Sequence, residues 1–188
     1  MSTRDLTLIA LFAALTAVCA QVSVAVPFFS SVPFTLQVFA VLASGAVLGS
    51  RRGFLSQVVY LLLGAAGAPV FARFHSGAQV LVGPTAGYLW AFPIAAYLAG
   101  WGDDAWRAPA ARSGRAVWLR LAAGLVCIYV FGAAGLVATG TVPTPARAIQ
   151  VGVVPFLPFD VVKAMLAGFV AQRLRSALPV LQVAAHDR

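Results

Sequence analysis

The chain has 188 residues, of which 61% are hydrophobic and only 10% are charged. A soluble domain has about 25% charged residues, and a small water-soluble fold needs more polar cover than this composition supplies. The composition therefore excludes an ordinary soluble domain and predicts an integral membrane protein with lipid as its surroundings.

The formal net charge is +8, from 13 Lys and Arg against 5 Asp and Glu. The basic residues lie between apolar runs, where flanking charges meet the lipid headgroups. They form no basic stripe of the kind that binds nucleic acid, so we predict no nucleic-acid partner.

Six apolar stretches, of which the third is short, resemble the run of about 20 residues that a helix needs to cross a bilayer. The first could begin as a secretory signal peptide, but its uncharged run exceeds the usual hydrophobic core of about 7–15 residues. We therefore predict an all-α bundle of six transmembrane helices that forms one domain over residues 1–188. The predicted spans are 6–26, 33–50, 54–67, 84–101, 118–139 and 157–177.

The arginines are distributed unevenly between the two sides of this bundle. With the N-terminus inside, ten arginines fall on the cytoplasmic side, and only Arg73 and Arg147 fall outside. The positive-inside rule therefore predicts cytoplasmic termini and a multi-pass protein of the cell membrane. The ten inner arginines are Arg4, Arg51, Arg52, Arg107, Arg112, Arg115, Arg120, Arg173, Arg175 and Arg188.

The first span carries alanines spaced four apart, Ala10 with Ala14 and Ala13 with Ala17. Such spacing gives a smooth helix face that another helix can approach closely. From the spacing alone, packing within this chain is the favoured interpretation.

The three outer connections, 26–33, 67–84 and 139–155, are rich in proline and contain aromatic residues. Gly and Pro after the third span predict an irregular segment, which at membrane depth must be buried in protein or line a cavity. These connections could form a lid over a cavity, or they could be ordinary interfacial turns with aromatic belt residues.

Asp160 and Lys163 lie at the outer start of the last span, and Lys163 is the single lysine of the chain. Charged groups in membrane helices are costly and tend to face the bundle interior or a wet cavity. The spacing of three places both on one helix face. They could form a ligand site, which we favour, or be a helix-start acid with a neutralising neighbour.

Other polar residues lie at the outer starts of two further spans: Thr35 and Gln37 in the second, and Thr85 and Tyr88 in the fourth. Each alone is more often an interhelical hydrogen-bond partner than a ligand contact. Together with the last span they predict a pocket of apolar walls with a few convergent polar groups.

Two cysteines, Cys19 and Cys127, lie in apolar runs without a Cys/His cluster, so we predict no metal site. An enzyme is disfavoured, because the sequence contains no Glu and both His75 and His186 lie outside the spans. A transporter that acts alone, as an oligomer, remains an alternative.

Four segments of the sequence match those of a known family, in the same order along nearly the whole chain. They are 34–38 (FTLQV), 64–72 (GAAGAPVFA), 83–89 (GPTAGYL) and 158–163 (PFDVVK). Through them the sequence resembles BioY, the biotin-specific S component of energy-coupling-factor (ECF) transporters. Ala86 is a departure, since glycine is expected there.

The resemblance implies high-affinity capture of biotin in a pocket near the outer surface, without a cofactor. Asp160 would accept from the ureido N–H groups, Lys163 would donate to the ureido carbonyl, and Phe71 and Tyr88 would line the rings. Arg73, backbone amides or a hydroxyl could bind the carboxylate tail.

The resemblance also implies partners. The alanine face of the first span (Ala10, Ala13, Ala14 and Ala17) would dock on a transmembrane scaffold subunit that couples to two cytosolic ATPases. The sequence has no G-x-x-x-x-G-K-[ST] motif, so ATP hydrolysis would belong to those partners.

Overall fold

The computed structural model describes residues 1–24, 32–102 and 114–177. Within these ranges the chain is almost entirely helical, with one short antiparallel pair of strands. The α-helices are α1 (Thr3–Gln21), α2 (Gln37–Leu48), α3 (Ser50–Ala65), α4 (Ala86–Ala99), α5 (Gly114–Ala138), α6 (Pro145–Gly152) and α7 (Leu157–Ala177). The other elements are strands β1 (Ser23–Val24) and β2 (Phe34–Thr35) and the 3-10 helices η1 (Ala72–Phe74) and η2 (Ala78–Val82).

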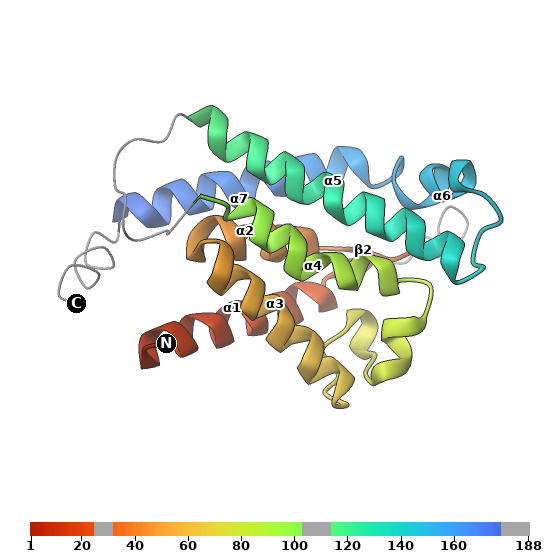
Figure 1. Ribbon diagram of the computed structural model, residues 1–188, viewed down its shortest axis with the longest axis horizontal. Coiled ribbons are helices and arrows are strands. Elements are labelled where there is room, and N and C mark those ends of the chain that lie inside the picture. The colour runs from red at the N-terminus through yellow and green to blue at the C-terminus, as the bar shows by residue number, and fades with distance from the viewer. Residues whose placement is uncertain (25–31, 103–113, 178–188) are drawn as a thin grey trace.

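The long helices run back and forth between two ends of the molecule (Figure 1). One end, which we call the arginine end, holds the start of α1, the α2–α3 connection, the start of α5 and the end of α7. The opposite end, which we call the loop end, holds the two strands, η1, η2 and α6.

Local signals in the sequence explain where several helices begin and turn. Ser2 and Asp5 form a reciprocal capping box at the start of α1. Gly49, at φ 84°, joins α2 directly to α3, a conformation that glycine adopts without steric cost. Thr144 caps α6, whose first residue is Pro145, a favoured residue at that position.

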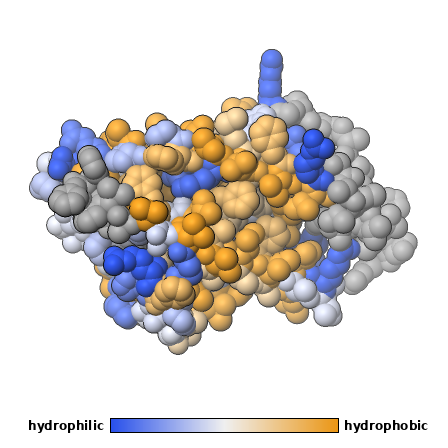
Figure 2. Space-filling view, turned by 180° about the vertical axis from the view of Figure 1, so that it is seen from behind, coloured by the Kyte–Doolittle hydropathy of each residue, from blue (hydrophilic) through white to orange (hydrophobic). Residues whose placement is uncertain are grey.

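The helices pack closely where small residues face each other. At the α4–α5 contact, a Cβ added to Gly135 would lie 2.7 Å from the Cα of Gly87, so both positions require glycine for this approach. The buried core includes Leu42, Tyr60 and Leu121, from three different helices. On the outside, Figure 2 shows hydrophobic side chains gathered across the middle of one face, with more hydrophilic ones toward both ends.

Fewer helices than the six predicted spans are long and apolar enough to cross a membrane. Among the described residues, α1 and α5 are long and apolar enough to cross a membrane. The bent pair of α6 and α7, at 60°, would count as a third. Helices α2 and α4 are apolar but have 12 and 14 residues, about 18 and 21 Å at 1.5 Å per residue. The helical class is confirmed, whereas the count of six and the orientation stay predictions.

Some predicted boundaries differ from the structure. The first span was expected to reach residue 26, but α1 ends at Gln21 and the chain continues into β1. The second was expected from residue 33, but Phe34 and Thr35 pair with β1 before α2 begins. Helix α6 was not predicted, because its eight residues lie in a proline-rich connection. Expectations for residues 25–31, 103–113 and 178–188 fall outside the described ranges.

Candidate binding pocket

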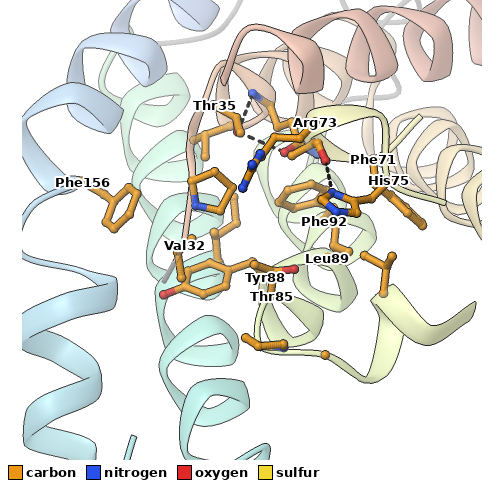
Figure 3. A pocket seen from close by; sticks show the side chains of 18 of the residues that line it. Val32, Thr35, Phe71, Arg73, His75, Thr85, Tyr88, Leu89, Phe92 and Phe156 are labelled. Atoms are coloured by element: carbon orange, nitrogen blue, oxygen red, sulfur yellow. Dashed lines mark hydrogen bonds between the residues drawn. The ribbon is translucent and has the colours of Figure 1, made fainter. Parts of the chain in front are cut away.

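A cavity of about 340 Å³ opens at the loop end of the bundle. Its volume lies within the range of about 300–1,000 Å³ typical of small-molecule pockets. Figure 3 shows labelled side chains around it that come from β2, η1 and α4, among them Thr35, Arg73 and Tyr88. Segments far apart in the sequence thus form its wall.

The buried ion pair of the last helix faces this cavity. Asp160 lies in the first turn of α7 and is 3% exposed. The Lys163 Nζ lies 2.7 Å from Asp160 Oδ1 and donates a second hydrogen bond of 2.6 Å to the Thr35 carbonyl. The Tyr129 hydroxyl, from α5, donates to Asp160 Oδ2 at 2.9 Å. Residues of α5, α7 and β2 therefore hold this ion pair in place.

The ion pair retains unused hydrogen-bond donors and acceptors for a polar ligand. An ionised carboxylate has about four acceptor sites and an ammonium has three donors. The contacts described above use one acceptor site on each Asp160 oxygen and two donors of Lys163. A ligand in the cavity could therefore donate to Asp160 and accept from Lys163, and both bonds would be charge-assisted.

A chain of hydrogen bonds orients the polar wall next to this pair. The Thr35 hydroxyl donates to Gln37 Oε1 at 3.0 Å, and Gln37 Nε2 donates to the Tyr60 hydroxyl at 2.8 Å. The Tyr60 hydroxyl in turn donates to the Val70 carbonyl at 3.2 Å. Because Tyr60 also meets Phe71 edge to face at 5.6 Å, this chain links β2, α2 and α3 to the segment before η1.

Aromatic and apolar side chains form the rest of the wall. Phe71 is 2% exposed and Tyr88 is 8% exposed, and the Tyr88 hydroxyl donates to the Gly152 carbonyl of α6 at 2.8 Å. The ring of Phe156 lines the cavity and stacks on Phe34 at 4.1 Å. Such flat, apolar walls suit a ligand with rings.

One guanidinium stands at the rim. Arg73, in η1, lines the cavity and is solvent-exposed. Its backbone adopts φ 60° and ψ 34°, the left-handed region that L-residues rarely occupy.

The structure brings all eight predicted substrate residues together around the cavity. Their role in binding stays a prediction. They are Thr35, Gln37, Phe71, Arg73, Thr85, Tyr88, Asp160 and Lys163.

Sequence reasoning missed other residues of the wall, most importantly Tyr129, which contacts Asp160 directly. A phenol in the otherwise apolar run 121–138 was the signal that could have identified it. Among the other residues missed are His75, Gln79, Phe92 and Phe156.

Two polar side chains of the helices, Gln57 and Trp90, lie away from this cavity. Gln57 is fully buried among the hydroxyls of Thr16, Ser44 and Ser56, so it joins α1, α2 and α3. Trp90 is exposed and donates to the Leu81 carbonyl. Across residues 1–24, 32–102 and 114–177, no three His, Cys, Asp or Glu side chains lie close enough to hold a metal ion.

The four alanines of α1 do not share one exposed face. Ala10 and Ala14 are exposed, Ala17 is partly buried against the core, and Ala13 is 1% exposed. Ala13 therefore packs inside this chain, as the spacing alone favoured. Of the four alanines, only Ala10 and Ala14 are exposed, and a docking role for them stays a prediction.

A helical bundle whose polar side chains converge on a cavity beneath irregular loops defines a membrane protein that binds a small molecule. The family model described as the BioY family matches residues 1–180. The chain belongs to the BioY family, which confirms the resemblance seen in its sequence.

Individual relatives match over almost their whole length. The chain is 42% identical to "Probable biotin transporter BioY" of Pyrococcus horikoshii, over 93% of this chain and 98% of that protein. It is also 42% identical to "Biotin transporter BioY" of Thermotoga maritima, over 92% and 96%. These names describe transporters, in agreement with the prediction that the chain is not an enzyme.

The fold also matches a solved structure, titled "Crystal structure at 2.1 A of the S-component for biotin from an ECF-type ABC transporter". The TM-score is 0.83 at 24% identity, and the match covers 94% of this chain and 95% of the other. At that identity the likeness establishes the arrangement of helices.

Proposed function

We propose that this chain captures biotin with high affinity at the outer face of the cell membrane and supports its uptake as the S component of an ECF transporter. The observation that carries the proposal is the cavity around the buried Asp160–Lys163 pair. It occurs in a chain that is similar over nearly its whole length to proteins named biotin transporters.

The ureido head of biotin fits the chemistry of the ion pair. It offers two N–H donors and one carbonyl acceptor, which match the carboxylate of Asp160 and the ammonium of Lys163. Hydrogen bonds that involve an ionised partner are shorter and about twice as strong as neutral ones. Phe71 and Tyr88 would then lie along the apolar rings.

The carboxylate tail of biotin fits the net charge of the pocket. The ionised side chains that line it, with histidine neutral, are Asp160, Lys163 and Arg73. Together they leave one excess positive charge, which complements a monoanionic ligand. We assign the tail to Arg73 at the rim, since Asp160 and Lys163 already form an ion pair at 2.7 Å.

We further propose that α1, α2, α3, α4, α5 and α7 are six membrane spans of a single domain with cytoplasmic termini. Their alternating direction supports this count. The orientation is supported by Arg4, Arg51 and Arg52 at the arginine end, whereas Arg73 and Arg147 belong to elements of the loop end.

Impermeant thiol labelling tests the orientation. In a variant without Cys19 and Cys127, cysteines at Ser76 and Thr144 should react from outside the cell. A cysteine at Ser2 should react only after the membrane is permeabilised. The opposite pattern would place the cavity on the cytoplasmic side and overturn the proposed capture from outside.

The exposed side of α1 is the proposed docking surface for the transmembrane ECF scaffold subunit, which in turn would couple to two cytosolic ATPases. Ala10 and Ala14 leave this side smooth, so another helix can approach closely. A tryptophan at either position should block that approach without reaching the cavity, which these two residues do not line.

Uptake in cells tests partnership against solitary action. Cells that make this chain together with an ECF module should take up labelled biotin, and Ala14→Trp should abolish both uptake and co-purification with the scaffold while purified protein still binds biotin. Equal uptake by cells without any ECF module would favour a solitary transporter instead.

A further inference from the structure

The rim of the cavity contains an unusual turn. Two consecutive non-glycine residues, Arg73 and Phe74, have φ values of 60° and 58°. Left-handed backbone is unfavourable for L-residues, and such conformations persist only where the surroundings hold them. The side chain of Phe74 cannot do so by burial, because the residue is 69% exposed.

A side chain from a distant part of the sequence holds this turn. Gln21, the last residue of α1, accepts a hydrogen bond from the Phe74 N–H at 3.0 Å through Oε1. Its Nε2 donates to the carbonyls of Phe71 at 3.2 Å and Val70 at 3.4 Å. One carboxamide thus binds backbone groups on both sides of Arg73.

Two further contacts are internal to the turn. The Phe71 N–H donates to the His75 carbonyl at 3.1 Å, and His75 Nδ1 lies 2.8 Å from the Ala72 carbonyl. Tyr60 of α3 holds the residues before Arg73, through its hydrogen bond to the Val70 carbonyl and its contact with the Phe71 ring. Gln21 adds the attachment on the other side of Arg73, at the Phe74 N–H, from α1 some fifty positions earlier in the chain.

Gln21 does not itself line the cavity, whereas Arg73 does. We infer that Gln21 is a positioning residue. By holding the left-handed turn, it keeps the Arg73 guanidinium at the cavity rim and so strengthens binding of the anionic end of the ligand without contacting it. This inference rests on the proposed pairing of Arg73 with the biotin carboxylate.

The test compares two ligands on the purified full chain: biotin, with its carboxylate, and biotin amide, whose tail is uncharged. Affinities are measured by competition with radiolabelled biotin for the parent, Gln21→Ala, Arg73→Ala and the double variant. Gln21→Met keeps the bulk of the side chain if the alanine variant folds poorly. Gln150→Ala is the matched control, because this glutamine contacts Arg147, outside the cavity.

Gln21→Ala removes the hydrogen bonds from the carboxamide to the turn. Biotin binding should then weaken about tenfold, the effect of one or two hydrogen bonds. Binding of biotin amide should change less than about twofold, and the control should leave both affinities unchanged. In the Arg73→Ala background, Gln21→Ala should add less than about twofold, because residues that act through one contact are not additive.

Equal weakening of both ligands by Gln21→Ala and Gln21→Met would overturn the inference and leave Gln21 a purely structural residue. The inference would also be overturned if Gln21→Ala weakened biotin binding about tenfold in the Arg73→Ala background. Arg73→Ala could weaken binding of biotin more than binding of biotin amide while the Gln21 variants weaken both equally. In that case the proposed carboxylate site stands and only the role of Gln21 fails. If Arg73→Ala weakens both ligands equally, the carboxylate assignment fails and the inference with it.

Discussion

Two ion pairs of nearly equal length lie at opposite ends of the bundle. At the arginine end, Arg52 contacts Asp5 at 2.8 Å, and at the loop end Lys163 contacts Asp160 at 2.7 Å. Each acid lies in the first turn of a helix. Their burial differs: the side chains of Arg52 and Asp5 are 32% and 18% exposed, whereas those of Lys163 and Asp160 are 12% and 4% exposed.

The partners of the two acids differ as well. Asp5 accepts from the backbone N–H of Ser2 and completes the capping box of its own helix. The carboxylate of Asp160 is bonded to two side chains, those of Lys163 and Tyr129, and all three residues line the cavity. A helix-start role therefore explains Asp5, but it does not explain why Asp160 faces a cavity. A buried pair is weak evidence for stability, which supports the proposal that Asp160 binds the ligand.

The comparison predicts its largest effect at Lys163. Replacing it with methionine removes a charge-assisted bond and leaves a buried carboxylate poorly compensated, a cost of about 2–4 kcal/mol. At about 1.4 kcal/mol per factor of ten, biotin affinity should fall about 30- to 1,000-fold. Biotin amide should lose as much, since the tail binds elsewhere. Binding close to that of the parent, in a variant that elutes as a folded monodisperse species, would make the pair structural.

A smaller effect is expected at Tyr129. Replacing it with phenylalanine removes the hydroxyl that donates to Asp160 Oδ2 and keeps the ring. Loss of one hydrogen bond to a charged group costs about 1.5 kcal/mol or more, so biotin affinity should fall about tenfold. Equilibrium dialysis with labelled biotin measures this. A matched control is Tyr97→Phe, a tyrosine of α4 that does not line the cavity and should bind normally. An unchanged affinity for Tyr129→Phe would show that Asp160 does not need this hydroxyl for its orientation.

The smallest effect is expected at the arginine end. Arg52→Gln removes a partly exposed ion pair, which contributes about 0–1 kcal/mol. Biotin affinity should stay within about twofold of the parent, and the thermal unfolding midpoint in detergent should shift by only a few degrees. A large loss of biotin binding in this variant would mean that the two ends are coupled, and the comparison would need revision.

The sequence predicted the loop-end pair because charged residues are rare in this chain. Lys163 is its single lysine, and Asp160 interrupts an apolar run. The same rarity of polar groups identified Thr35, Gln37, Thr85 and Tyr88, whereas Phe71 and Arg73 came from the family resemblance. Tyr129 escaped notice, because a single tyrosine in a long apolar helix gives no periodic signal, and its partner lies 31 residues further along the chain.

Other features depend on tertiary geometry that local patterns do not encode. In α1 most residues are apolar on every side, so the alanine spacing could not tell that Ala13 is buried and Ala14 exposed. The left-handed turn at Arg73 arises where no glycine marks it, because Gln21 holds it from another helix. The two strands were missed since each has only two residues.

The most direct test of the central claim compares one substitution made at both ends. Asp160→Asn and Asp5→Asn each remove one carboxylate charge from the first turn of a helix. Calorimetric titration of biotin into both purified variants should give an affinity about 30- to 1,000-fold weaker for Asp160→Asn and one within about twofold of the parent for Asp5→Asn. Equal affinities for the two folded variants would contradict the assignment of Asp160 to the ligand.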